Sequence, residues 1–120
     1  MRDGTLVFAV LAYEITNNAQ HNYVLYTKDM GDTWDLSEGP TKGETDEAKL
    51  VELNNGDLMI SIRRTWERSQ QYSKDLGKTW YRDMKMNNVS HYRTNGDMRR
   101  MTSVIDGFEK DRLLHTLIFY

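Results

Sequence analysis

Cysteine is absent from the 120-residue sequence, which excludes disulfide scaffolds, cysteine-ligated zinc and cysteine nucleophiles. One proline and eight glycines argue against a collagen-like or low-complexity chain. No apolar run approaches the roughly 18 residues of a membrane-spanning helix. Basic residues are not in excess, since 16 Lys and Arg against 18 Asp and Glu give a net charge of -2, so no nucleic-acid partner is expected. The length and composition are those of one small globular domain.

The apolar segment 5–13 follows Arg2 and has the length of a short signal-peptide core. Asp3 and Gly4 occupy the place of a basic leader region, and Asp-Gly before an apolar run is typical of a turn that feeds a strand. We therefore expect a strand here and no targeting segment.

Two patterns repeat along the chain. A turn ending in Gly4, Gly56 or Gly107 precedes an apolar run, with spacings of 52 and 51 residues. In addition, residues 27–34 (TKDMGDTW) match residues 73–80 (SKDLGKTW) in register. A period near 50 residues built from short strands is typical of β-propeller blades.

Short segments rich in β-branched, aromatic and other apolar residues alternate with Asn, Asp and Gly clusters, and no helical period extends over about 11 residues. We predict an all-β chain with about two blades and a part of a β-propeller. It begins at the second strand of one blade and ends in the second strand of another. The predicted strands are 5–13, 22–27, 48–53, 58–63, 69–74, 99–105 and 112–119, with a further strand opening at Trp80.

The repeated eight-residue window has the form Ser/Thr-x-Asp-x-Gly-x-Thr-Trp, known as the Asp-box. Its Asp can accept N–H groups of its own turn, its Gly supplies a positive φ, and its Trp is expected to bury its ring beneath the turn. A structural role explains every position, so neither Asp is assigned to catalysis or calcium binding. These residues are Asp29, Gly31 and Trp34 in the first box and Asp75, Gly77 and Trp80 in the second.

The segment 45–63 (TDEAKLVELNNGDLMISIR) lies between the boxes. Together with the boxes and the run 95–103 (NGDMRRMTS), it resembles the sialidase (neuraminidase) family, particularly bacterial exo-α-sialidases of the gut Bacteroidetes type. Their pattern is a strand that opens with Glu, a Gly turn, and an apolar strand that ends in Arg. The resemblance covers nearly the whole chain. It implies a six-bladed β-propeller that removes terminal sialic acid from glycoconjugates with retention of configuration.

The resemblance also implies site residues. Glu47 matches the glutamate that pairs with a catalytic tyrosine, which needs a base because phenol has a pKa of about 10. Arg63 matches one of three arginines that clamp the sialic acid carboxylate with a planar fork. Antiparallel strands joined by the turn 54–57 should bring both to one end of a hairpin. Asp97 is a further substrate-binding candidate, because the family brings this segment close to the sugar pocket.

The family's remaining machinery cannot be assigned within residues 1–120: the first and third arginines, the acid/base aspartate and the nucleophilic tyrosine. We therefore expect an internal piece that needs the remaining blades as partners and is inactive alone. No cofactor is implied, and the three histidines lack metal-ligand spacing. The resemblance implies a periplasmic or secreted bacterial protein that acts on sialylated glycans.

Three alternatives stay open at this stage. The chain could belong to a non-catalytic Asp-box propeller that binds carbohydrate or protein, although such a scaffold has no need of Glu47 or Arg63. It could belong to another propeller glycosidase, which would use paired carboxylates and no arginine cluster. A trans-sialidase, or an enzyme that forms an anhydro product, shares the same residues. Trp66, just after Arg63, is expected either to stack on sugar or to cover the blade.

Overall fold

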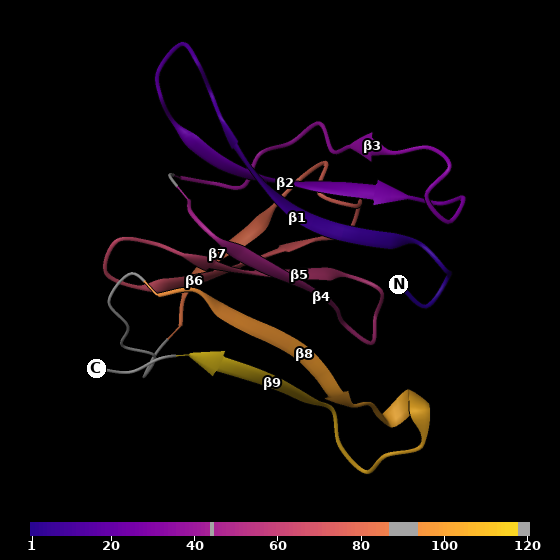
Figure 1. The fold of residues 1–120 in the computed structure, drawn as a ribbon. Coiled ribbons are helices and arrows are strands. Elements are labelled where there is room, and N and C mark those ends of the chain that lie inside the picture. The colour runs from indigo at the N-terminus through magenta and orange to yellow at the C-terminus, as the bar shows by residue number, and fades with distance from the viewer. Residues whose placement is uncertain (44, 87–93, 118–120) are drawn as a thin grey trace.

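The computed structural model describes residues 1–43, 45–86 and 94–117. These residues form antiparallel β-sheets that lie one above another in Figure 1. The elements, in chain order, are β1 (Leu6–Tyr13), β2 (Gln20–Thr27), β3 (Asp35–Leu36), β4 (Ala48–Glu52), β5 (Leu58–Arg63), β6 (Arg68–Ser73), β7 (Tyr81–Lys85), β8 (Gly96–Thr102), the short 3-10 helix η1 (Val104–Asp106) and β9 (Arg112–Leu117).

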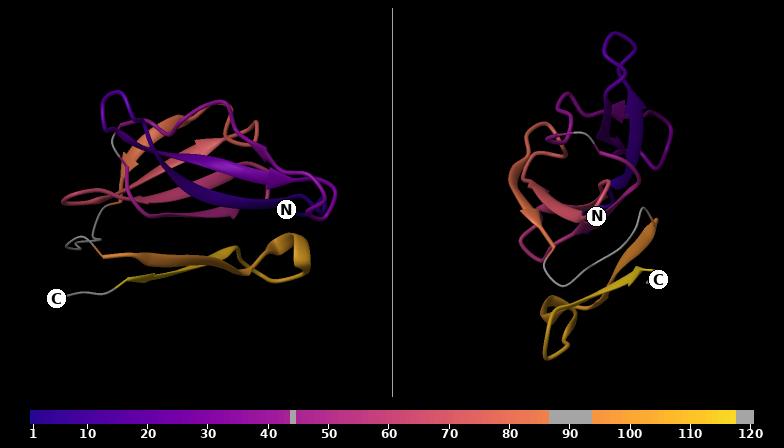
Figure 2. Two further views of the ribbon diagram at one scale, coloured as in Figure 1. Left: turned by 45° about the horizontal axis from the view of Figure 1, so that its top comes forward. Right: turned by 90° about the vertical axis from the view of Figure 1, so that its left-hand side faces the viewer.

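The strands pair as β1-β2-β3, β4-β5-β6-β7 and β8-β9. The middle sheet is a complete four-stranded blade, and two views in Figure 2 show the other sheets on either side of it. By comparison with the complete blade, β1 to β3 are the second to fourth strands of a blade. In the same way, β8 and β9 are the first two strands of another. The prediction of about two blades and a part is confirmed, and so is the strand at which the chain begins.

The strand β5 is buried on both faces because a sheet packs on each side of it. Leu58, Ile60 and Ile62 point toward the first sheet and form a core with Val24 and Trp80. The alternate residue Met59 belongs to a second cluster on the side of β8. Period-two alternation thus divides one strand between two inter-blade cores.

The repeated turns share one backbone conformation. Gly4, Gly56 and Gly107 have φ values of 90°, 84° and 86°. A β-carbon at any of the three would meet nothing within 4 Å, so the left-handed backbone and not lack of space favours glycine here.

The two Asp-boxes have the same internal hydrogen bonds. The Thr33 N–H donates to Asp29 Oδ1 over 2.9 Å, and the Thr79 N–H donates to Asp75 Oδ1 over 2.8 Å. In each box the same threonine hydroxyl donates to the other carboxylate oxygen over 2.6 Å. Both carboxylates are therefore held inside their own turns.

The second box closes the joint between the first two sheets. A β-carbon on Gly77 would lie 2.5 Å from Val24 Cγ2, so β2 can approach this turn closely only because Gly77 has no side chain. Trp80 is 6% exposed, and its indole N–H donates to the Gly39 carbonyl over 3.2 Å. Gly39 follows the first sheet, so this ring is covered by the preceding blade.

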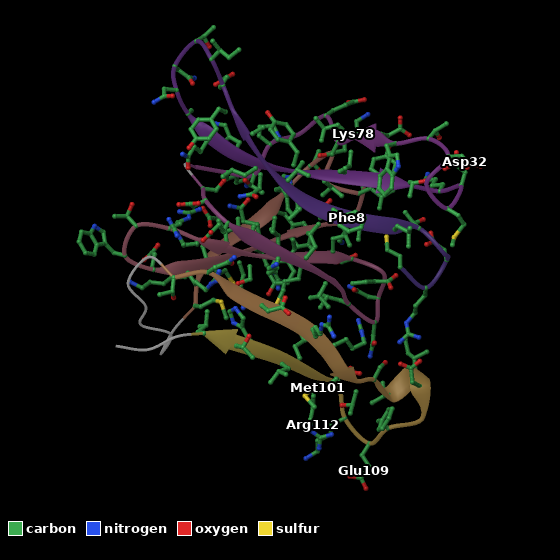
Figure 3. All side chains as sticks on the ribbon, in the orientation of Figure 1. Phe8, Asp32, Lys78, Met101, Glu109 and Arg112 are labelled. Atoms are coloured by element: carbon green, nitrogen blue, oxygen red, sulfur yellow. The ribbon has the colours of Figure 1, made fainter. Side chains whose placement is uncertain are left out.

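The first box differs, and the expectation that Trp34 buries its ring is wrong. Trp34 is 43% exposed, its indole N–H donates to Gly31 of its own turn, and it packs on the Phe8 ring at a centroid distance of 5.7 Å. Phe8, labelled in Figure 3, is itself 51% exposed. In the described residues no sheet lies over this ring as the first sheet lies over Trp80.

The strand predicted over 99–105 is also corrected, because β8 ends at Thr102. The Ser103 side chain accepts the Ile105 N–H over 3.2 Å and starts η1, which Gly107 ends with a left-handed conformation. Residues 118 and 119 of the last predicted strand lie outside the described residues. Within the described residues, no helix is long and apolar enough to cross a membrane.

We predict that Trp80→Ala lowers the free energy of unfolding of the chain by about 3–5 kcal/mol, because it opens a cavity between two sheets. Trp34→Ala should cost about 1 kcal/mol, because that ring is already half in water. Urea unfolding followed by circular dichroism measures both. An equal loss of unfolding free energy in the two variants would contradict the conclusion that Trp80 is buried between two sheets while Trp34 is not.

Hydrogen bonds from Thr27 and Thr33 hold the pKa of the Asp29 carboxyl well below its usual value. For Asp75, burial raises the pKa, but hydrogen bonds from Thr79 and Ser73 outweigh it and the net pKa is lowered. Each lowered pKa contributes stability above the ordinary carboxyl pKa of 3.8. That contribution is lost as the pH falls through the lower folded-state pKa.

We therefore expect Asp75→Asn to lower the free energy of unfolding more at about pH 7 than at about pH 2, because the contribution of the ionised carboxylate declines as the pH falls below the ordinary carboxyl pKa of 3.8. Urea unfolding at the two pH values tests this. Asp32→Asn is the matched control, because this box residue is exposed and its carboxylate accepts no hydrogen bond in the described residues. If the unfolding free energies of Asp75→Asn and of the control change equally between the two pH values, the Asp75 carboxylate does not contribute the pH-dependent stability.

Candidate active site

The hairpin of β4 and β5 brings an acidic pair and an arginine together. Ala48 is paired with Ile62, so Glu47 lies opposite Arg63, whose N–H donates to the Glu47 carbonyl over 2.9 Å. The side chains also meet: Arg63 Nη1 donates to Glu47 Oε2 over 2.9 Å, and Arg63 Nη2 is paired with Asp46. All three side chains are partly exposed, with 22% for Arg63, 32% for Asp46 and 42% for Glu47. The Arg63 guanidinium is thus held by two carboxylates, and its side chain remains partly exposed.

A buried asparagine from the neighbouring sheet holds the acidic pair in place. Asn22 on β2 is 1% exposed, and its amide donates to Thr45 Oγ1 over 2.9 Å and to the Asp46 carbonyl over 2.6 Å. Its backbone exchanges hydrogen bonds with Thr41. Because these contacts fix the segment that leads into β4, the position of Glu47 depends on the joint between two blades. Sequence reasoning gave Asn22 no role, since its contacts are with residues far along the chain.

A second arginine lies beside the first. Arg68 begins β6 directly opposite Arg63 and is 0% exposed. None of its three side-chain nitrogens has a hydrogen-bond partner among the described residues. Burial lowers the pKa of Arg68, while the charge of Glu47 opposes that effect. Sequence reasoning missed this residue, although its place five residues after Arg63 puts it next to the hairpin end.

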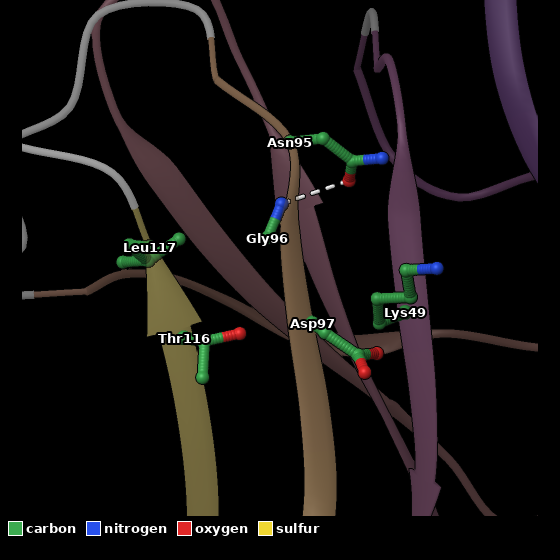
Figure 4. Close-up of a pocket in the computed structure, with 6 residues that line it drawn as sticks. All are labelled: Lys49, Asn95, Gly96, Asp97, Thr116 and Leu117. Carbon is green, nitrogen blue, oxygen red and sulfur yellow. Dashed lines mark hydrogen bonds between the residues drawn. The ribbon is translucent and has the colours of Figure 1, made fainter.

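Asp97 lies in the adjoining cleft between β4 and β8. Figure 4 shows it across from Lys49, near the residues that begin β8. The cleft holds about 450 Å³ and is also lined by Asn95, Gly96, Thr116 and Leu117. Asp97 accepts the Met98 N–H over 2.9 Å and lies 3.8 Å from Arg99. It is 54% exposed, so a ligand in this cleft can reach it.

The Asp-boxes lie at the other end of the blades. Strand β6 begins at Arg68, beside Arg63, and ends at Ser73, where the second box starts. Glu52 is likewise distant from Glu47, because it ends β4 and accepts the Arg2 N–H over 2.8 Å. Neither box carboxylate can act on a ligand held by Arg63.

Trp66 occupies the turn between β5 and β6, at the same end as Glu47. It is 71% exposed, and the turn is closed by the Arg64 N–H, which donates to the Glu67 carbonyl over 2.9 Å. Of the two roles considered from the sequence, covering the blade fits this exposure poorly. Among the described residues, no group of three or more His, Cys, Asp or Glu side chains could hold a metal ion.

The pattern of sheets, turns and boxes has counterparts among known proteins. A family model described as "BNR repeat-like domain" matches residues 1–117. The chain belongs to this family. It is 37% identical over 82 residues to a sialidase from Bacteroides fragilis, an alignment that covers 67% of this chain and 15% of that protein. The chain spans 10 to 22% of the length of the curated sialidases that it matches.

Solved sialidase structures share the fold. The K499G mutant of NanB sialidase from Streptococcus pneumoniae matches with a TM-score of 0.72 and 24% identity over 92% of this chain and 16% of that one. Trypanosoma rangeli sialidase in complex with the inhibitor DANA matches with a TM-score of 0.68 and 25% identity, covering 83% of this chain and 17% of that one. This member of the BNR repeat-like family is therefore all-β and forms part of a sialidase-type β-propeller.

Proposed function

We propose that the chain is part of a retaining exo-α-sialidase, in which Glu47 is a catalytic base and Arg63 binds the carboxylate of sialic acid. The observation that carries the proposal is the Arg63–Glu47 pair at 2.9 Å, at the partly exposed end of the β4–β5 hairpin. The sialidases among the relatives support the substrate class.

The chemistry of the substrate accounts for both side chains. The anomeric carbon of sialic acid carries a carboxylate, so a carboxylate nucleophile would meet repulsion there. A neutral tyrosine avoids this, in contrast to glycosidases with two carboxylates. Its hydroxyl must lose a proton as it attacks, and Glu47 is the base assigned to accept it. The tyrosine lies outside this chain.

The guanidinium of Arg63 fits the second task. It is planar, permanently charged and able to bind a carboxylate through two parallel N–H groups. In the structure Asp46 and Glu47 already present carboxylate oxygens to it. A substrate carboxylate would take part of this position, and Glu47 would then be released toward the tyrosine. Asp97 is proposed to contact another part of the sugar from the adjoining cleft.

In the full-length natural protein that carries residues 1–120, we expect Glu47→Gln to lower kcat for a fluorogenic sialoside by about 10²–10⁴-fold, because the tyrosine loses its base. Arg63→Lys should chiefly raise KM, because a point charge replaces the two-pronged fork. Steady-state kinetics with the purified variants measures both effects.

Glu52→Gln is the matched control, because it removes the same charge from the other end of β4 and should leave both constants near those of the unchanged protein. A Glu47→Gln variant as active as the control would refute the assignment of the base. Binding of sialosides without turnover by the unchanged protein would instead favour the non-catalytic propeller.

A further inference from the structure

We propose that Arg68 is a positioning residue that balances the charge of the acidic pair Asp46–Glu47, so that Arg63 can accept a ligand carboxylate. This inference rests on the proposed function, because it concerns the same site. It starts from the buried guanidinium of Arg68, whose three nitrogens have no hydrogen-bond partner among the described residues.

The strand register places three charged side chains in one row. Glu47 is opposite Arg63 at the end of the hairpin, and Arg63 is opposite Arg68 in the register of β5 and β6. Residues directly opposite one another on neighbouring strands project from the same face of a sheet. This is the face toward β8, since a β-carbon on Gly96 would lie 3.0 Å from Arg68 Nη1. Arg68 therefore lies inside the joint next to the site, beneath the start of β8.

A row of this kind needs opposite charges to be stable. Like charges directly opposite each other on neighbouring strands are destabilising, so Arg63 and Arg68 should not lie side by side without acids nearby. Asp46 and Glu47 supply the acids. Both are paired with Arg63, so the charge of Arg68 is balanced through space and not by direct contact.

The charge count shows what Arg68 does for binding. Asp46, Glu47 and Arg63 alone would carry a net negative charge and repel an anionic ligand from Arg63. With Arg68 the four side chains are neutral, so one more carboxylate can approach. Among the described residues that line the adjoining cleft, Lys49 on β4 and Asp97 on β8 add one charge of each sign and leave this sum unchanged.

The first test is a double-mutant cycle on stability in the full-length natural protein, with Arg68→Met, Glu47→Gln and the double variant. Methionine fills a similar volume without the buried charge. Each single variant unbalances the row, and the double variant restores the balance. We expect the unfolding constants to depart from additivity by at least about threefold. Additive effects would overturn the proposal.

The second test is the affinity for the sialic acid analogue DANA, measured by calorimetry. Arg68→Met should weaken binding about tenfold, because one positive charge is lost at side-chain range in a partly buried site. Arg68→Lys keeps the charge and should lose much less affinity for DANA than Arg68→Met. If Arg68 were needed only for the shape of its side chain, lysine would not restore the affinity. Equal affinity of the unchanged protein and Arg68→Met would overturn the proposal.

Arg64→Met is the matched control, because it removes the same positive charge from the position next to Arg63 in the sequence. Arg64 is paired with Asp83 over 2.7 Å and takes no part in the row of Glu47, Arg63 and Arg68. DANA affinity should therefore be nearly unchanged in this variant. If the unchanged protein binds no DANA and cleaves no sialoside, the proposed function fails, whereas the stability cycle still decides whether Arg68 balances Glu47.

Discussion

The register of the β4–β5 hairpin determines where Glu47 and Arg63 lie relative to each other. Ala48 faces Ile62, and this pairing sets Glu47 opposite Arg63 at the end of the hairpin. Because side chains alternate between the two faces of a strand, a slip of one residue would turn Arg63 away from its partners. The apolar alternation along β5 opposes such a slip, since it fills two different cores. The packing of the blades therefore positions the charges at their ends.

Contacts between neighbouring blades also help to position the side chains of the site. Asn22 of the first sheet binds the backbone of Asp46, and Arg68 of the second sheet lies against the start of β8. At the opposite end, Trp80 closes the first joint and keeps the two sheets in a fixed relation. The box end thus stabilises the stack of sheets, while the other end carries the side chains assigned to chemistry.

Much of the architecture could be predicted because it is encoded locally. Gly56 and its two counterparts recur at positions that need a positive φ, and the boxes form their hydrogen bonds within eight residues. The meeting of Glu47 and Arg63 followed from strand length and one turn. These features depend on neighbours in sequence or on a single hairpin, so a pattern is enough to find them.

The rest depends on distant parts of the chain. The exposure of Trp34 differs from that of Trp80 because different surroundings cover two boxes of the same pattern. The burial of Arg68 and the anchoring role of Asn22 arise from pairs of sheets, and a polar residue in a short strand gives no signal of either. The strand predicted over 99–105 was misplaced because apolar residues after Thr102 suggested further strand, whereas Ser103 caps a helical turn there.

The most direct test of this account is a crystal structure of the full-length natural protein with DANA bound. We expect the carboxylate of DANA to accept two hydrogen bonds of about 2.9 Å from the Arg63 guanidinium, with Glu47 shifted away from that arginine. A structure in which Arg63 stays paired with both Asp46 and Glu47, while the carboxylate of DANA lies elsewhere, would contradict the account.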